Sequence, residues 1–335
     1  MVLALAIVVA VTACGVILWR LDWTALSAFD GTEPWVLLLV AALLHLLTLP
    51  LKAVAWRTTL AAELADRPIP VRLVVGPVSV GALFNIVLVG RIGEAARILL
   101  MHSRLRAGGG DAPLPAVVGS AVTESIVSTV AWVAMVAGIG LVLPLPRIVW
   151  IVVAALGVAW IAILLAAARG RGPVATAASR RGVLGRALGS VGRVWSSVAH
   201  GHRSLRRPAV LGPLVIVSVL GWVAQGASVY AILHAFDIAG GWSAAALVLV
   251  STTVAQTVPL LPGNVGVYQA AVALPLVTTF GTPAATAVAA GIVLQLVQSA
   301  PVAIAGAVSL ARGGEDVGRV YRAARNLRGP SPRPA

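Results

Sequence analysis

The chain has 335 residues, of which 59% are hydrophobic and 11% charged, with a net charge of +14. Because a soluble domain carries about 25% charged residues, this composition excludes a soluble enzyme or a soluble binding module as the bulk of the chain. In a soluble protein the positive charge would indicate nucleic acid binding. Here the arginines gather in loops between apolar segments, as in the cytoplasmic loops of membrane proteins. We therefore predict an all-α, polytopic membrane protein that binds no nucleic acid.

Apolar segments follow one another along the whole chain. Several exceed the roughly 17 residues that a helix needs to cross the hydrocarbon core of a bilayer. In chain order they are 2–19, 34–51, 73–90, 114–143, 148–168, 209–234, 243–262, 266–280 and 284–311. Cys14 is the only cysteine, so a disulfide within the chain is excluded.

The charges between these segments predict their orientation. Loop 52–72 holds Lys52 and three arginines, segment 169–208 holds nine arginines and no acid, and the tail 312–335 holds six arginines. All three should be cytoplasmic, whereas loop 20–33, with three acids against one arginine, should face outward. Both termini are then cytoplasmic, and the basic tail should be partly disordered. The predicted full spans are 2–19, 34–51, 114–143, 148–168, 209–234 and 284–311.

Segment 73–90 does not fit this pattern as a full span. Basic loop 52–72 precedes it, and a second basic stretch, 91–112, follows it. We expect the segment to enter from the cytoplasm, to break at 90–93, where two glycines flank Arg91, and to return as 94–105. The alternative is an ordinary span followed by an interfacial loop with solvated charges.

A second break falls in 258–266, where the sequence VPLLPGNVG has two prolines and two glycines. These residues do not continue a helix, so a second hairpin should enter from the outside. Paired broken helices in corresponding places indicate inverted-topology repeats with a binding site at their interface. We predict one membrane domain over 1–311, with repeat one at 34–168, a cytoplasmic basic loop at 169–208 and repeat two at 209–311. The alternative is eight or more ordinary spans with kinks.

The two breaks should meet near the centre of the membrane. Glu94 and Arg97 are three residues apart and share a face of the returning helix, so Glu94 could neutralise Arg97 or Arg91, or carry a proton. Both returning helices would point their N-termini inward, where free N–H groups and partial positive charge suit an anionic group. The predicted substrate-binding residues are Asn85, Arg91, Gly93, Glu94, Arg97, Glu124, Pro262, Gly263, Asn264, Gly266 and Gln269.

Glu124 is the other acid at membrane depth. It lies ten residues inside span 114–143, about 15 Å along a helix. It could be a hydrogen-bonded contact between helices or part of a transport pathway. Other polar residues are expected to join helices: His45, Gln225, Gln256, Gln295 and Gln298. Lys52, Trp56 and Arg57 are expected to anchor the end of a span at the interface, and the alternative is contact with a lipid head group at the cytoplasmic leaflet.

Two motifs resemble the signatures of a known family. NIVLVGRIGEAAR (85–97) is similar to N-x-x-x-P-x-R-x-G-E-x-x-R, and VPLLPGNVGVYQ (258–269) is similar to P-x-x-P-G-x-x-G-x-x-E. These are the signatures of the lysylphosphatidylglycerol synthase transmembrane-region family, also called the flippase-like domain. Val89 replaces the proline of the first signature, and Gln269 replaces the glutamate of the second. Over 34–311 the resemblance implies a bacterial inner-membrane protein related to lipid flippases, and we expect no soluble aminoacyl-transfer domain.

The sequence has no P-loop, no HExxH motif, no Cys/His cluster at metal-ligand spacing and no Gly-x-Ser-x-Gly elbow. We therefore expect no catalytic residue, metal or cofactor, and predict a flippase for a lipid with an anionic or zwitterionic head group or for a polyprenyl-linked intermediate. The alternatives are an integral-membrane transferase with Glu94 or Glu124 as general base, and an accessory subunit that acts through loop 169–208. Expected partners are membrane lipids, with a lipid-synthesising enzyme or a second copy of the chain as further candidates.

Overall fold

The computed structural model describes Phe29, residues 31–65, 67–88, 92–108, 112–142, 207–257 and 264–313, and a few positions between 147 and 158. This part of the chain is all-helical and contains no strand. In chain order the helices are α2 (Glu33–Glu63), α3 (Val71–Val87), α4 (Ile92–Ala107), α5 (Leu114–Val142), α9 (Pro208–Ala235), α10 (Gly241–Thr257), α11 (Val267–Phe280) and α12 (Ala284–Arg312). The predicted all-α class is confirmed for these residues.

The helices follow one pattern twice, namely a long helix, two short helices and a second long helix. The long helices α2, α5, α9 and α12 have 28 to 31 residues and are apolar enough to cross a membrane. The short helices have 14 to 17 residues, or about 21 to 26 Å at 1.5 Å per residue, which is less than the roughly 30 Å of a hydrocarbon core. Predicted spans 34–51, 114–143, 209–234 and 284–311 therefore have counterparts. Span 2–19 lies outside the described residues, and 148–168 is described at only a few positions.

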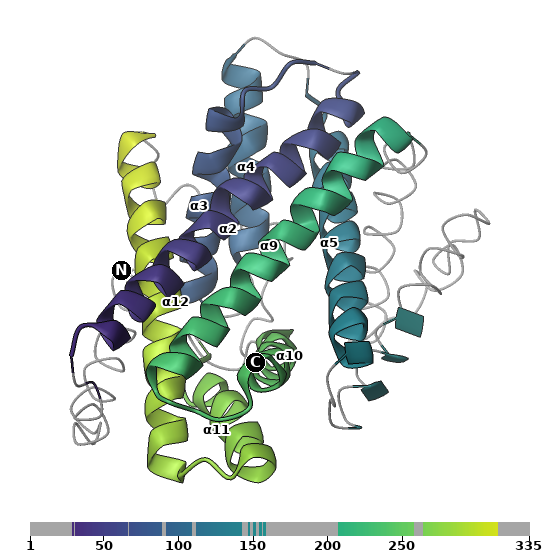
Figure 1. The fold of residues 1–335 in the computed structure, drawn as a ribbon. Helices are drawn as coiled ribbons and strands as arrows, with labels where there is room; N and C mark the ends of the chain where they lie inside the picture. The colour runs from purple at the N-terminus through teal and green to yellow at the C-terminus, as the bar shows by residue number, and fades with distance from the viewer. Residues whose placement is uncertain are drawn as a thin grey trace, which may run out of the picture.

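Helices α2 and α9 lie side by side and run in opposite directions through the centre of the bundle (Figure 1). The Ser228 hydroxyl donates a hydrogen bond of 2.9 Å to the Ala41 carbonyl near one end. Ala55 and Leu214 pack together near the other end. Small residues such as Ala41 and Ala55 allow two membrane helices to approach closely, and this pair forms the most extensive helix contact in the described part of the chain.

Each extensive contact between helices of the described chain has a counterpart when the first four helices are exchanged with the last four, although the counterparts differ in extent. When α2, α3, α4 and α5 are exchanged with α9, α10, α11 and α12, every extensive helix contact of the described chain is matched by another. For example, α3 packs on α4 as α10 packs on α11, whereas α3 packs extensively on α12 and α10 makes only a small contact with α5. The two short-helix pairs lie toward opposite ends of the bundle, α3 and α4 at the top of Figure 1 and α10 and α11 at the bottom.

Close backbone contacts hold each short-helix pair together. Gly81 of α3 faces Gly93 of α4 so closely that a Cβ atom on Gly93 would collide with the Gly81 carbonyl oxygen. The Gly93 N–H group, at the start of α4, donates a 3.0 Å hydrogen bond to the Asn85 side chain of α3. In the second pair, the Ser251 hydroxyl of α10 donates to the Ala271 carbonyl of α11 at 2.6 Å.

Helix α2 is longer than its predicted span, because it continues past Pro50 to Glu63. The prediction of a loop beginning at residue 52 is therefore wrong. The continuation is stabilised by packing, since Ala53, Trp56 and Leu60 are all fully buried. A proline inside a membrane helix is tolerated where neighbouring helices satisfy the freed backbone groups. As a result Lys52 lies on the helix, well before its end, instead of in a loop.

Candidate functional site

A cavity of about 370 Å³ lies between the two halves of the bundle, lined by seven of the described helices, all except α4. Its acidic and basic lining residues are His45, Lys52 and Glu124. Six carboxamide side chains also line it: Asn85, Gln225, Gln256, Asn264, Gln295 and Gln298. Hydroxyl groups come from Thr48, Ser128, Ser218, Tyr268 and Ser299. Polar groups are costly to bury in an apolar bundle unless they are hydrogen-bonded. A cavity with this many polar groups therefore indicates a binding site.

Arg97 is the centre of an ion network at one wall of this cavity. Its side chain is 2% exposed, and its Nε atom lies 2.6 Å from Glu94 Oε2. Its Nη2 atom lies 3.0 Å from Glu124 Oε2 and 3.5 Å from the Ser125 hydroxyl. The guanidinium also lies over the ring of Trp56, 4.8 Å from its centroid. An arginine is suited to this place, because its planar fork can serve two carboxylates and stack on an aromatic ring at once.

The extended part of α2 positions this network against α5. The indole N–H group of Trp56 donates to the Ser120 hydroxyl at 3.0 Å. The Thr59 hydroxyl lies between two carbonyl oxygens, 2.9 Å from that of Trp56 and 3.0 Å from that of Ser120. These contacts fix the indole ring on which the guanidinium rests. The network thus depends on the turn of α2 that the sequence prediction assigned to a loop.

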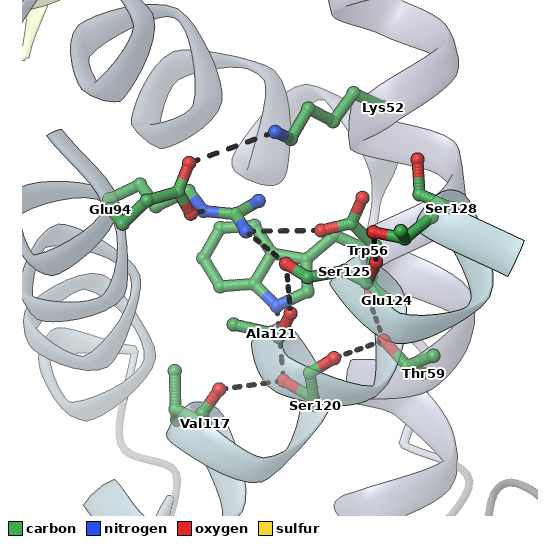
Figure 2. Close-up of polar contacts among 12 residues, drawn as sticks. Lys52, Trp56, Thr59, Glu94, Val117, Ser120, Ala121, Glu124, Ser125 and Ser128 are labelled. Carbon is green, nitrogen blue, oxygen red and sulfur yellow. Dashed lines mark hydrogen bonds and ion pairs between the residues drawn. The ribbon is translucent and has the colours of Figure 1, made fainter. Parts of the chain in front are cut away.

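Lys52 joins the network from the cavity side. Figure 2 shows its ammonium pointing toward Glu94, and the Nζ–Oε1 distance is 3.8 Å. Both side chains are accessible, Lys52 at 42% and Glu94 at 38%. Lys52 is the only lysine or arginine among the described residues that line the cavity. The network therefore has a buried, closely bonded part around Arg97 and an open, loosely bonded part at Lys52.

The start of α11 forms the opposite wall. Asn264 and Gly266 have positive φ angles of 52° and 87°, so the chain turns sharply before the helix begins at Val267. The Gly266 N–H group donates to Gln269 Oε1 at 2.6 Å, and the Gln269 amide in turn donates to Gln295 Oε1. The Tyr268 hydroxyl donates to Gln298 Oε1 at 3.0 Å. Gln269 thus caps α11 and ties it to α12.

Comparison with protein families identifies the chain. The sequence model of the lysylphosphatidylglycerol synthase transmembrane region matches residues 1–306. The chain belongs to this family. Comparison with curated proteins and with solved structures gave no match. Family membership and the four apolar spans establish a multi-pass membrane protein with a function related to membrane lipids, and they confirm the resemblance that the two motifs indicated.

In this family member, several of the predicted site residues come together. Asn85, Glu124 and Asn264 line the cavity, while Glu94 and Gln269 contact the lining residues Lys52 and Gln295. Arg97 is buried beside Glu124 and is not part of the lining. The glycines mark the helix starts, since Gly93 lies in the first turn of α4 and Gly266 immediately before α11. Three predicted residues lie outside the described part of the chain: Arg91, Pro262 and Gly263.

The sequence interpretation did not assign Lys52, His45 or the glutamines of α9, α10 and α12 to a site, but the cavity contains them. A signal was present in the spacing. Besides 51 and 55 on α2 and 217 on α9, the lining positions are 45, 48, 49 and 52 on α2, then 218, 221, 222 and 225 on α9, and 295, 298, 299 and 302 on α12. Each set follows i, i+3, i+4, i+7, which is one face of a helix. In the described residues no three metal-ligating side chains of His, Cys, Asp or Glu cluster.

Proposed function

We propose that this protein is a flippase, which moves a lipid with an anionic or zwitterionic head group, or a polyprenyl-phosphate-linked intermediate, from one leaflet to the other. The observation that carries the proposal is the polar cavity of about 370 Å³ between the two halves. A head group would occupy this cavity while its acyl or prenyl chains stay in the surrounding lipid. The outer surface suits this arrangement, since Trp35, Leu39 and Leu43 of α2 are more than half exposed and would face lipid tails.

We further propose that the two halves are inverted-topology repeats, each with a re-entrant hairpin, and that transport occurs by alternating access. Three observations support this. The order of long and short helices occurs twice, the helix contacts are matched under exchange of the halves, and the short-helix pairs lie toward opposite ends of the bundle (Figure 1). In membrane transporters with such repeats, the binding site lies where the broken helices meet. Here Asn85 of α3 and Asn264, in the turn before α11, both line the cavity.

The distribution of charge supports an orientation with the top of Figure 1 in the cytoplasm. The loops and helix ends there carry Arg67, Arg72, Arg104, Arg106, Arg207 and Arg312. The opposite end carries Glu33 and Asp237, with Arg147 as its one described arginine. By the positive-inside rule, we propose a bacterial inner-membrane protein with both termini in the cytoplasm.

A transferase with Glu94 or Glu124 as general base has less support from the geometry. A general base must reach the proton that it removes, whereas Glu124 is 3% exposed and bonded to Arg97. Glu94 is bonded to Arg97 at 2.6 Å through one oxygen and faces Lys52 with the other. Both carboxylates thus have positioning partners, and a transporter without catalysis is the function that we prefer.

Filling the cavity tests the proposal. In α9, a Cβ atom on Gly221 would meet no atom within 4 Å, and Gly221 lines the cavity. Gly221→Leu should therefore fold and insert its side chain into the cavity, and we expect it to stop the exchange of fluorescent lipids between the leaflets of reconstituted liposomes. Gly212→Leu is the matched control, because Gly212 lies on the same helix, is exposed, does not line the cavity and is equally open around its Cβ.

Two results would overturn the proposal that the protein is a flippase. One is wild-type protein that exchanges no lipid class but forms product from a lipid-linked donor. The other is equal exchange by Gly221→Leu and Gly212→Leu, both monodisperse and equally stable to heat.

A further inference from the structure

Among the described charged residues that line the cavity, the cation Lys52 is more available to a ligand than the acid Glu124. Both carboxylates are held by the buried guanidinium of Arg97, Glu94 at 2.6 Å and Glu124 at 3.0 Å. Among the described residues Lys52 is held only by its contact of 3.8 Å with Glu94, and its side chain is 42% exposed. Since a compact ammonium group binds phosphate readily as a point charge, an entering phosphate can replace this long contact with a shorter one.

An amine on the head group would meet the opposite situation. Glu124 is the only acid among the described residues that line the cavity, and its side chain is 3% exposed and bonded to Arg97. An ammonium group entering the cavity would therefore have to break a buried ion pair to gain a carboxylate. It would also approach Lys52, and like charges at close range repel strongly in a partly desolvated site.

The rest of the polar lining is neutral and can both donate and accept hydrogen bonds. Six carboxamides and five hydroxyl groups contribute to it, and both kinds of group match the donor and acceptor capacity of ligand hydroxyls. Four buried polar atoms of lining residues have no hydrogen-bond partner in the described part of the chain: His45 Nδ1, Ser218 Oγ, Asn264 Oδ1 and Gln298 Nε2. Because buried polar groups in proteins are nearly always satisfied, these atoms are donors and acceptors that a ligand with several hydrogen-bonding groups can use.

We propose that the cavity selects a head group that combines one phosphate with several hydroxyl groups, as in a polyol phosphate or a sugar phosphate, and that it rejects aminoacylated head groups. The phosphate binds Lys52, and the hydroxyls bind the amides and hydroxyls of α9, α11 and α12. This inference rests on the flippase proposal, which it makes more specific. The same chemistry occurs in a polyol phospholipid and in a polyprenyl-phosphate sugar, so both belong in the test.

Transport of acyl-labelled lipids in proteoliposomes gives the first measurement. Phosphatidylglycerol is compared with phosphatidic acid, which lacks the polyol, with phosphatidylethanolamine, which is zwitterionic, and with lysylphosphatidylglycerol, which is cationic. A second set compares a polyprenyl-phosphate sugar with the polyprenyl phosphate alone. We expect phosphatidylglycerol, the polyprenyl-phosphate sugar, or both, to exchange roughly tenfold faster than each comparison lipid of the same set. The loss of one or two hydrogen bonds to a charged or polar site has an effect of this size. Whichever set has this preference identifies the lipid source.

Three variants assign the preference to residues. Lys52→Gln should remove the preference for phosphatidylglycerol over phosphatidylethanolamine, whereas Lys52→Arg should keep it. Gln298→Leu should bring the rates of phosphatidylglycerol and phosphatidic acid together, with little change for phosphatidic acid. Thermal unfolding in detergent checks that each variant is folded.

Binding provides a readout that is independent of transport. Short-chain forms of the same phospholipids, and the polyprenyl pair solubilised in the same detergent, are added to the purified protein, and the shift of the unfolding temperature is measured. Selective stabilisation by a hydroxylated anion without exchange of any lipid would support this inference and overturn the flippase. Exchange of lysylphosphatidylglycerol at the rate of phosphatidylglycerol, or equal exchange of all the lipids, would overturn this inference. It would not contradict the proposal that the protein is a flippase.

Discussion

The buried guanidinium of Arg97 contacts two carboxylates and an aromatic ring, and its side chain has almost no access to solvent. Removing its charge would leave Glu124, itself 3% exposed, as an unpaired buried acid. Breaking a buried ion pair in this way costs about 3 kcal/mol or more. We therefore expect Arg97→Gln to unfold at a markedly lower temperature than wild type, measured by tryptophan fluorescence during heating in detergent.

Arg106→Gln is the matched control for this prediction, because Arg106 is exposed near the end of the same helix. It should change the unfolding temperature little. The double variant Arg97→Gln with Glu124→Gln should lose less stability than the sum of the single variants, since contacting residues couple. Equal losses in Arg97→Gln and Arg106→Gln would contradict the role assigned to the ion network.

Gln269 has two separable roles, as the cap of α11 and as the partner of Gln295. Gln269→Leu removes both and should destabilise by about 1 kcal/mol or more, the usual effect of losing a helix cap. Gln269→Glu restores the residue type of the family signature. It should be tolerated, because a carboxylate still accepts from the Gly266 N–H group and a rotated Gln295 amide can donate to it. Unfolding temperatures that fall from wild type to Gln269→Glu to Gln269→Leu would support this prediction. A Gln269→Glu variant as unstable as Gln269→Leu would contradict it.

At the residue scale, the sequence indicated the part of the site that has a distinctive motif or a rare charge. Glu94 and Glu124 stood out because acids are expensive at membrane depth, and Asn85, Asn264 and Gln269 lie in the two motifs. The glutamines could not be assigned in the same way. A lone glutamine on an apolar helix has the same local sequence whether it faces a cavity or a neighbouring helix, and only the packing of three helices decides which.

At the scale of the elements, the α3–α4 pair depends on the absence of a side chain at Gly93. A Cβ atom there would lie 2.5 Å from Asn85 Oδ1 and would collide with the Gly81 carbonyl. We expect Gly93→Ala to force α3 and α4 apart, to break the Gly93–Asn85 hydrogen bond and to abolish lipid exchange. Liposome transport and unfolding temperature both measure this.

Gly138→Ala in α5 is the control, because a Cβ atom on Gly138 would meet no atom within 4 Å. Alanine is the better helix former by up to about 1 kcal/mol, so this variant should be as stable as wild type or more so. Equal behaviour of the two alanine variants would exclude a tightly packed hairpin at Gly81 and Gly93.

Element positions were largely predictable, because apolar runs and helix-breaking residues are strong local signals. Helix α10 ends at Thr257 and α11 begins at Val267, on either side of the predicted break at 258–266. The end of α2 was missed because Lys52 and Arg57 were interpreted as marking an interface. The helix continues there because Trp56 and Thr59 bond to Ser120, and such long-range contacts leave no local trace in the sequence.

At the scale of the whole molecule, the proposed orientation gives a direct prediction. Ala107 and Ala239 are both exposed and lie at opposite ends of the bundle (Figure 1). In a Cys14→Ser background, Ala239→Cys should react with a membrane-impermeant maleimide in intact spheroplasts. Ala107→Cys should react only after permeabilisation. Neither substitution removes a charge, so the topology signal stays intact, and the reverse labelling pattern would contradict the orientation.

The cavity is lined equally by both halves, yet Lys52 and Glu124 both belong to the first half, and the described lining of the second half is uncharged. A duplicated transporter with identical halves would have inward-open and outward-open forms of equal free energy, since each form is the other with its halves exchanged. If this protein works by the proposed alternating access, its two forms differ in free energy, because they place the same charges in different surroundings, and populations follow such differences. Under the proposed alternating-access mechanism, the empty protein therefore has a resting side. Substitutions in the Arg97 network should shift that resting equilibrium even where they leave the head group's contacts untouched.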